Sequence, residues 1–159
     1  MAIRATSGAR VVVLDHEACV EIYKVRERLE PLALSGSLQN PTQGQLASIA
    51  EGAQPRASSA QLWCLPEADR NLHFTAYAGA TPRLLKMIET FWSTTQHYRR
   101  LLLTTWTTED CVINDHEHGP LANAILEHNS RAGEDILRLH LESARSRLTR
   151  RAALFDREA

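Results

Sequence analysis

The chain has 159 residues, of which 43% are hydrophobic and 23% charged, and its formal net charge at pH 7 is −1. This length and composition are typical of one globular domain with a buried core. A chain of near-neutral charge has no general electrostatic attraction to nucleic acid or to an anionic membrane. No apolar run reaches the ~20 residues of a membrane span, so we expect no membrane partner.

The first third of the chain predicts one short strand and two helices. The run RVVVL (10–14) is the only clear β pattern. Asp15 is predicted to cap a first helix, in which Pro31 produces a kink or a division. Residues 36–43 predict a turn, and Thr42 is predicted to cap a second helix that ends near residue 54. At helical spacing, the apolar stripe of the first helix comprises Ala18, Ile22, Val25, Leu29 and Leu32.

The remaining sequence predicts a loop and four further helices. The loop covers residues 54–59, and the third helix runs from about 66 to 77, with Gly79 placed to end it in a left-handed conformation. The fourth helix covers 81–103, with Thr81 as its cap and Pro82 in its first turn, and its stripe comprises Leu85, Ile88, Trp92, Thr95, Arg99 and Leu102. The fifth and sixth helices are predicted over about 108–127 and 130–155. Short connections favour antiparallel neighbours, so the expected fold is an all-α antiparallel bundle of about six to seven helices.

The three cysteines, Cys19, Cys64 and Cys111, are odd in number and widely spaced. This pattern suggests neither a disulfide framework nor a CxxC metal site. The N-terminal segment MAIRATSGAR (1–10) also lacks the apolar core of a signal peptide. We therefore expect reduced thiols in a cytoplasmic protein.

Two functional side chains share one face of the third helix. Asp69 and His73 are four residues apart, and Leu65, Leu72 and Ala76 mark the same side as the buried one. A carboxylate and an imidazole on an apolar face form either a hydrogen-bonded core pair or part of a binding site. This pair alone does not separate the two interpretations.

Two further histidines lie on the apolar faces of the last two helices. His118 precedes Asn129 by eleven residues and His140 follows it by eleven. At ~1.5 Å per residue both lie about 16 Å from the turn, so they are level in an antiparallel hairpin. One inward-facing histidine is more often a satisfied core residue than a ligand. Three of them with a carboxylate form a sound first shell for a divalent metal such as Zn, Ni, Cu or Fe.

The other four histidines fit this cluster poorly. His116 points to nearly the opposite side of its helix from His118, and His128 lies at a helix end. His97 lies away from the centre of its stripe, and His16 is in the first turn of the first helix. We predict that these four are solvated or boundary residues.

Two arginines are predicted near the core. Arg99 lies in the fourth-helix stripe, and Arg26 flanks the stripe of the first helix. Each could snorkel or pair with a nearby glutamate. The functional alternative is that they bind a carboxylate whose other end reaches the metal, because the planar guanidinium pairs two oxygens at once.

The order of these motifs resembles a known family. The relevant segments are EIYKVRERLEPLAL (21–34), DRNLHFTAYAGA (69–80), EHGPLANAI (117–125) and LRLHLESA (137–144). Together they resemble the FCD domain, the C-terminal effector-binding domain of FadR-subfamily GntR transcription regulators. Each motif alone is weak, but four in the right order and spacing, covering about residues 20–150, are specific. Many members carry Asn where this chain has Ala80, so the local helix-end geometry is expected to differ there.

The resemblance implies a helical bundle around a central metal and ligand cavity. It implies a divalent metal on Asp69, His73, His118 and His140, with Zn as the first expectation and Ni or Mn as alternatives. It also implies a small carboxylic-acid effector beside the metal, with Arg26 at the position of the helix-one arginine, and a homodimer.

The resemblance also suggests domain boundaries. Residues 15–155 would form the FCD-like effector-binding domain, and residues 1–14 a tail or the remnant of a winged-helix wing and linker, which GARVVVLD (8–15) resembles. DNA binding is then expected only through a winged-helix domain that this sequence lacks.

We therefore predict a non-enzymatic, ligand-sensing domain of a GntR/FadR-type regulator. One alternative is a metal-dependent helical-bundle enzyme, but the nearest candidate base, Glu117, is predicted to point about 100° away from His118. The other alternative is a metal-free interaction module.

Overall fold

The structure is a computed structural model that describes residues 16–53 and 66–151, apart from the side chains of residues 97 and 101. Within these ranges all regular structure is helical, which confirms the all-α prediction. The predicted strand over 10–14 lies outside the described residues. The helices are α1 (His16–Leu38), α2 (Gln43–Ala53), α3 (Pro66–Ala76), α4 (Pro82–Thr104), α5 (Thr108–Leu126) and α6 (Ser130–Arg150).

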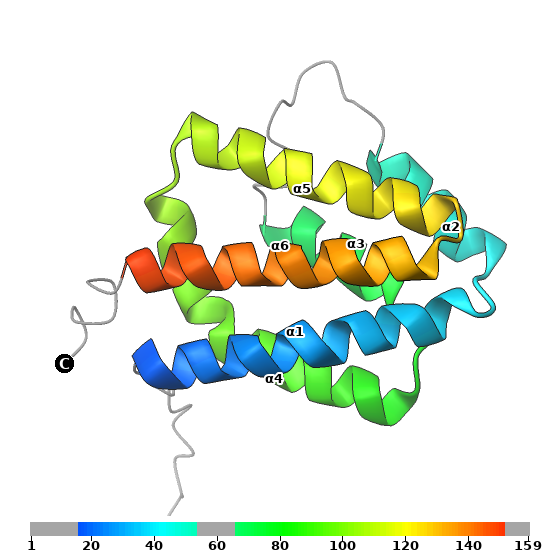
Figure 1. The fold of residues 1–159 in the computed structure, drawn as a ribbon, viewed down its shortest axis with the longest axis horizontal. Helices are drawn as coiled ribbons and strands as arrows, with labels where there is room; N and C mark the ends of the chain where they lie inside the picture. Colours follow the sequence, from blue (N-terminus) through cyan, green and yellow to red (C-terminus); the bar gives the residue numbers. More distant parts are fainter. Residues whose placement is uncertain (1–15, 54–65, 152–159) are drawn as a thin grey trace, which may run out of the picture.

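The long helices form an antiparallel bundle. In Figure 1, α6 lies between α5 and α1 and runs opposite to both, and α4 runs opposite to α1 on its other side. The short helix α3 lies behind this layer, and its main backbone neighbours are α2 and α1. No described helix is both long enough and apolar enough to cross a membrane.

Local hydrogen bonds explain where several helices begin. Thr107 and Asp110 form a capping box at the start of α5: the Thr107 hydroxyl accepts from the Asp110 N–H at 3.2 Å, and the Asp110 carboxylate accepts from the Thr107 N–H at 2.8 Å. Asn129 caps α6 by accepting from the N–H of Ala132 at 3.1 Å. The hydroxyl of Thr42 accepts from the Gln45 N–H at 3.1 Å and so confirms the predicted cap of α2.

The predicted apolar stripes are confirmed for α4, α5 and α6. Ile88, Trp92 and Leu102 are buried on α4, as is the polar Thr95. On α5 and α6 the buried side chains flanking the histidines are Leu121, Ala122, Ile125, Leu137 and Leu148. These three helices therefore bury the faces that their periodicity predicts.

The predicted stripe of α1 lies at the edge of the buried face and not at its centre: Ala18, Ile22 and Leu29 are only partly buried against the core. Leu32 is 59% exposed, whereas Arg26, Glu27 and Glu30 are at most 5% exposed. The charged face turns inward because each charge has a partner: Arg26 Nε lies 2.6 Å from Glu30 Oε1, and Arg145 Nε on α6 lies 2.5 Å from Glu27 Oε1. Helix α1 also continues through Pro31 and past residue 36, where a turn was predicted.

The prediction of three reduced thiols is also wrong. Cys111 is disulfide-bonded, whereas Cys19 is a free and buried thiol. Cys64 lies outside the described residues.

Candidate metal centre

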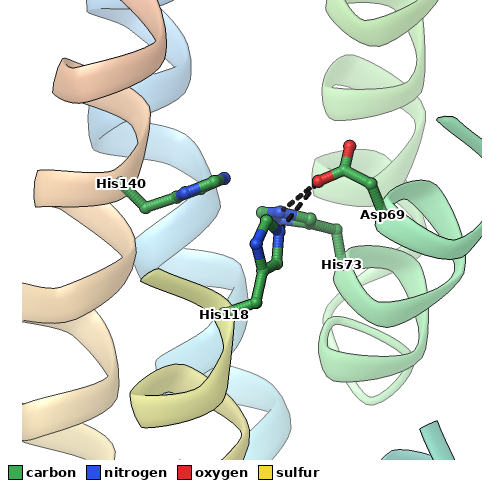
Figure 2. Close-up of side chains that lie close together, drawn as sticks. All are labelled: Asp69, His73, His118 and His140. Atoms are coloured by element: carbon green, nitrogen blue, oxygen red, sulfur yellow. Dashed lines mark hydrogen bonds and ion pairs between the residues drawn. The ribbon is translucent and has the colours of Figure 1, made fainter. Parts of the chain in front are cut away.

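Four side chains from three helices converge inside the bundle. Asp69 and His73 come from α3, His118 from α5 and His140 from α6. Their candidate ligand atoms all lie within 4.8 Å of one another. Figure 2 shows the three imidazoles and the carboxylate pointing toward a common centre. The four residues predicted from the sequence are therefore brought together.

The geometry follows from helical spacing and level packing. One turn separates Asp69 and His73 on α3, and the His73 Nε2 lies 3.5 Å from Asp69 Oδ1. The rings of His118 and His140 have centroids 4.4 Å apart across the α5–α6 hairpin, as their equal distance from Asn129 predicts. All four side chains are buried, with at most 7% exposure.

Each histidine has its Nδ1 engaged by a different oxygen. His118 Nδ1 lies 2.7 Å from the backbone carbonyl oxygen of Asn114. His140 Nδ1 lies 2.9 Å from Glu117 Oε2. A carbonyl and a carboxylate only accept, so both Nδ1 atoms carry the proton and both Nε2 atoms present a lone pair. An imidazole that is oriented through its Nδ1 proton and presents the Nε2 lone pair is typical of metal-bound histidine.

His73 is oriented through a tyrosine. The Tyr77 hydroxyl donates its single proton to Glu30 Oε2 at 2.7 Å, so its oxygen accepts from His73 Nδ1, also at 2.7 Å. The His73 Nε2 is buried and has no hydrogen-bond partner among the described residues. A buried nitrogen with an unused lone pair is costly unless something binds it. The chemistry of this atom therefore fits a metal ligand.

The contact between His118 and Asp69 also points to a cation. His118 Nε2 lies 2.9 Å from Asp69 Oδ1, although its proton is on Nδ1. A lone pair then faces a carboxylate oxygen, and two acceptors at this distance repel each other. A divalent cation coordinated by both would remove the repulsion, so the donor set of one carboxylate and three imidazoles fits such an ion.

Burial keeps the three imidazoles neutral. It is the largest cause that lowers the pKa of His73 to about 3, of His118 to about 4 and of His140 to about 3. Neutral imidazole is the form that coordinates a metal. The site is therefore in a metal-binding protonation state at neutral pH.

The two predicted arginines both lie close to the centre. Arg99 pairs through Nη2 with Asp69 Oδ2, and its guanidinium carbon is 4.0 Å from the centroid of the Trp92 ring. Arg26 pairs with Glu30 and lies 4.6 Å from the centroid of the same ring. The ion-pair alternative is therefore present for both. Each nevertheless keeps one buried Nη1 without a partner among the described residues.

A small cavity of about 40 Å³ adjoins the cluster. Asp69 and His140 form part of its wall, together with Arg99. Apolar and aromatic side chains form most of the rest, namely Tyr23, Leu102, Leu103, Trp106 and Ala144. A cavity beside open ligand atoms and a guanidinium provides space for a small anion.

The sequence prediction missed the residues that orient the ligands. Glu30 and Tyr77 support His73, and Glu117 accepts from His140 and is held by Arg147 Nη2 at 2.8 Å. Glu117 was considered only as a base on the far side of its helix. One signal existed: Tyr77 follows His73 by four residues, the spacing at which helical side chains meet. The other contacts join helices distant in sequence and leave no local pattern.

The histidines that were predicted to lie outside the metal cluster, as solvated or boundary residues, agree with the structure where it describes them. His116 and His128 are exposed, and His16 is partly buried. The side chain of His97 is outside the described part of the chain.

Comparisons with known proteins identify a family and a protein of similar fold. A family model described as FCD domain matches residues 21–143. No curated protein sequence matches the chain. Among solved structures, E. coli McbR/YncC has a similar fold, with a TM-score of 0.73 and 18% sequence identity. The similarity covers 84% of this chain but 65% of McbR/YncC, so the chain spans less than two thirds of the length of that protein.

Proposed function

The chain belongs to the FCD domain family, and from that premise we propose that it is the effector-binding domain of a GntR/FadR-type transcription regulator that binds a divalent metal and a small organic acid. The observation that carries this proposal is the convergence of Asp69, His73, His118 and His140 with an oriented imidazole at every histidine. A metal-free interaction module gives no reason for this arrangement of lone pairs.

The donor set suits a borderline metal. Three imidazole nitrogens and one carboxylate oxygen are typical ligands of Zn²⁺, our first expectation, and also fit Ni²⁺ or Mn²⁺. The bound ion would supply a Lewis-acid anchor for an effector carboxylate. Asp69 offsets part of the ion's charge, and Arg99 fixes the second oxygen of Asp69.

The effector would lie in the cavity beside the cluster. Arg99 lines that cavity and has an unused buried Nη1, so it is the arginine better placed to receive a carboxylate oxygen. Arg26 is the less direct candidate for binding the effector. It pairs with Glu30, and Glu30 is connected to His73 through the Tyr77 hydroxyl. Its own free Nη1 is a second potential donor.

The proposed domain is a sensor and not an enzyme. The nearest candidate base, Glu117, is fully engaged. Burial alone would raise its pKa, but hydrogen bonds from His140, Arg147 and Ser143 outweigh burial and lower the pKa to about 2. A carboxylate of that acidity is a poor general base at neutral pH.

In a complete regulator the domain would act as a homodimer in the cytoplasm. Effector binding would shift the packing of the helices and hence the separation of paired winged-helix domains on DNA. DNA contact is proposed only through those winged-helix domains, and not through this bundle.

Metal analysis of protein purified without a polyhistidine tag tests the proposal. Elemental analysis should find about one divalent ion per chain, because the structure offers one such cluster within its described residues. The variant His118→Ala should lose most of the ion, whereas His116→Ala, which removes an exposed histidine two residues away, should retain it. A native protein without metal, or equal loss in both variants, would contradict the proposal.

A further inference from the structure

Two buried donors without a hydrogen-bond partner belong to residues that line the cavity but are not part of the metal cluster. The indole Nε1 of Trp106 and the guanidinium Nε of Arg147 are buried, and neither has a hydrogen-bond partner in the described part of the chain. Both residues line the cavity that Asp69 and His140 also line. Arg147 is 5% exposed, and its guanidinium carbon lies 5.5 Å from the centroid of the Trp106 ring.

Unpaired buried donors are expensive unless an acceptor reaches them. A buried N–H without a partner costs about 1–3 kcal/mol, and more when the group is charged. The other two nitrogens of Arg147 are used by Glu117, with Nη2 at 2.8 Å and Nη1 at 3.4 Å. Glu117 therefore fixes the orientation of the guanidinium while Nε stays available. Arg147 and Trp106 form a preorganised pair of donors, which we name the Arg147–Trp106 pair.

The charges around the site balance before a metal is added. Three arginines near the cavity and cluster each have one carboxylate partner: Arg99 pairs with Asp69, Arg147 with Glu117 and Arg26 with Glu30. The three histidines would bind the ion in their neutral form and so add no charge. A bound divalent ion would then leave the buried site with a net excess of two positive charges. Such a site favours a ligand with two negative charges.

We propose that the cavity receives a compact dicarboxylate, with one carboxylate at the metal centre beside Asp69 and His140 and the other on the Arg147–Trp106 pair. This inference rests on the proposed metal site and specifies the chemical class of its effector. A carboxylate has two acceptor oxygens, which match one indole N–H and one guanidinium N–H. The apolar wall of Leu102, Leu103 and Ala144 suits the short carbon chain between the two carboxylates.

The cavity limits the length of the ligand. Its volume of about 40 Å³ is only a few times the ~10–15 Å³ that one water molecule needs by the same measure. An acid of three or four carbons fits this limit better than a long-chain or aromatic acid. Malonate and succinate are therefore suitable probes, with acetate as the matched ligand that lacks the second carboxylate.

Calorimetric titration of the zinc-loaded full chain tests the assignment. Malonate or succinate should bind at least about tenfold more tightly than acetate, the gain expected from one charge-assisted contact. Trp106→Phe removes the indole N–H and keeps an aromatic ring, and Arg147→Lys keeps the charge and removes Nε. Each should abolish most of the dicarboxylate advantage over acetate. Trp106→Phe should leave acetate binding within about twofold of the native value, whereas Arg147→Lys also loosens Glu117, so its effect is read only as the ratio of dicarboxylate to acetate affinity. Arg138→Lys, the same substitution at an exposed site on α6, should change neither ligand.

The outcomes separate this inference from the metal proposal. Metal content is measured after each titration, so that stripping of zinc by the acid is not mistaken for binding. A chain that holds no metal would overturn both proposals. Three results with a metal-loaded chain would overturn the dicarboxylate assignment alone. They are acetate binding as tight as dicarboxylate binding, inorganic phosphate binding tighter than either dicarboxylate, and an equal loss of acetate and dicarboxylate affinity in Trp106→Phe.

Discussion

At the residue scale, His140 depends on a side chain from the neighbouring helix. Glu117 on α5 accepts from His140 Nδ1 at 2.9 Å and also from the Ser143 hydroxyl at 2.6 Å. This carboxylate fixes the tautomer and orientation of the imidazole and increases its basicity. Residues in such positions affect metal affinity although they do not touch the ion.

The variant Glu117→Gln should therefore weaken metal binding without removing a ligand. The amide keeps an acceptor oxygen for His140 but loses the negative charge, and we expect metal affinity to fall about 10- to 100-fold. Competition with a chromophoric chelator measures the change. Glu109→Gln, which removes an exposed carboxylate from the first turn of the same helix, should leave the affinity unchanged. Equal affinities for the two variants would show that Glu117 does not support the site.

At the element scale, the end of α3 is held against α1 by a close backbone approach. The Ser37 hydroxyl accepts from the Gly79 N–H at 2.9 Å and from Gln45 Nε2 at 2.8 Å. Gly79 was predicted to end α3 with a left-handed backbone, but no glycine in the described ranges has positive φ. Its role is spatial: a Cβ there would lie 3.1 Å from both the Cα and the carbonyl oxygen of Ser37.

The variant Gly79→Ala should consequently destabilise the fold. The added methyl group meets backbone atoms of α1 that cannot move alone, and we expect a loss of about 1–3 kcal/mol in the free energy of unfolding. Urea denaturation measures this loss. Gly36→Ala provides the control, because a Cβ at that exposed helical position meets nothing within 4 Å. It should stabilise the protein by about 0.5–1 kcal/mol, and a similar gain in Gly79→Ala would refute the close-approach argument.

At the scale of the whole molecule, the candidate metal ligands come from parts of the bundle that have few backbone contacts with one another. The ligands come from α3, α5 and α6, whereas the main backbone neighbours of α3 are α2 and α1. A bound ion would hold α3 against the α5–α6 hairpin. Effector binding at the same centre could then change how these helices pack, which is the requirement for a sensor.

Metal removal should therefore lower the stability of the whole domain. At a free metal concentration of 1,000 times Kd, binding contributes about 4 kcal/mol, so chelation should lower Tm by about 10 °C for a domain of this size. Thermal unfolding followed by circular dichroism, with and without a chelator, measures the shift. In His118→Ala the chelator should have little effect. An equal shift in that variant would mean that the chelator acts elsewhere.

The sequence alone predicted the helices and the four candidate ligands. Helix bounds depend on caps, prolines and apolar periodicity, which are local. The predictions of the Thr42 cap, of a helix over about 108–127 and of the α4 stripe illustrate this. The level positions of His118 and His140 follow from counting residues on each side of one short turn. Helical spacing alone placed Asp69 beside His73, and the short α5–α6 connection gave the other pair.

Only the tertiary structure decided which face of α1 is buried, which residues orient the histidines and where the cavity lies. Arg26 and Glu30 turn inward because Trp92 and Tyr77, about fifty residues away or more, supply their partners. Arg147 and Glu117 pair across two helices, and of the cavity donors Arg147 lies on α6 and Trp106 in the connection between α4 and α5. Interactions between distant residues leave no periodic signal in the sequence, because only folding brings those side chains together. The partner that each buried charge then meets offsets the free energy lost on desolvation.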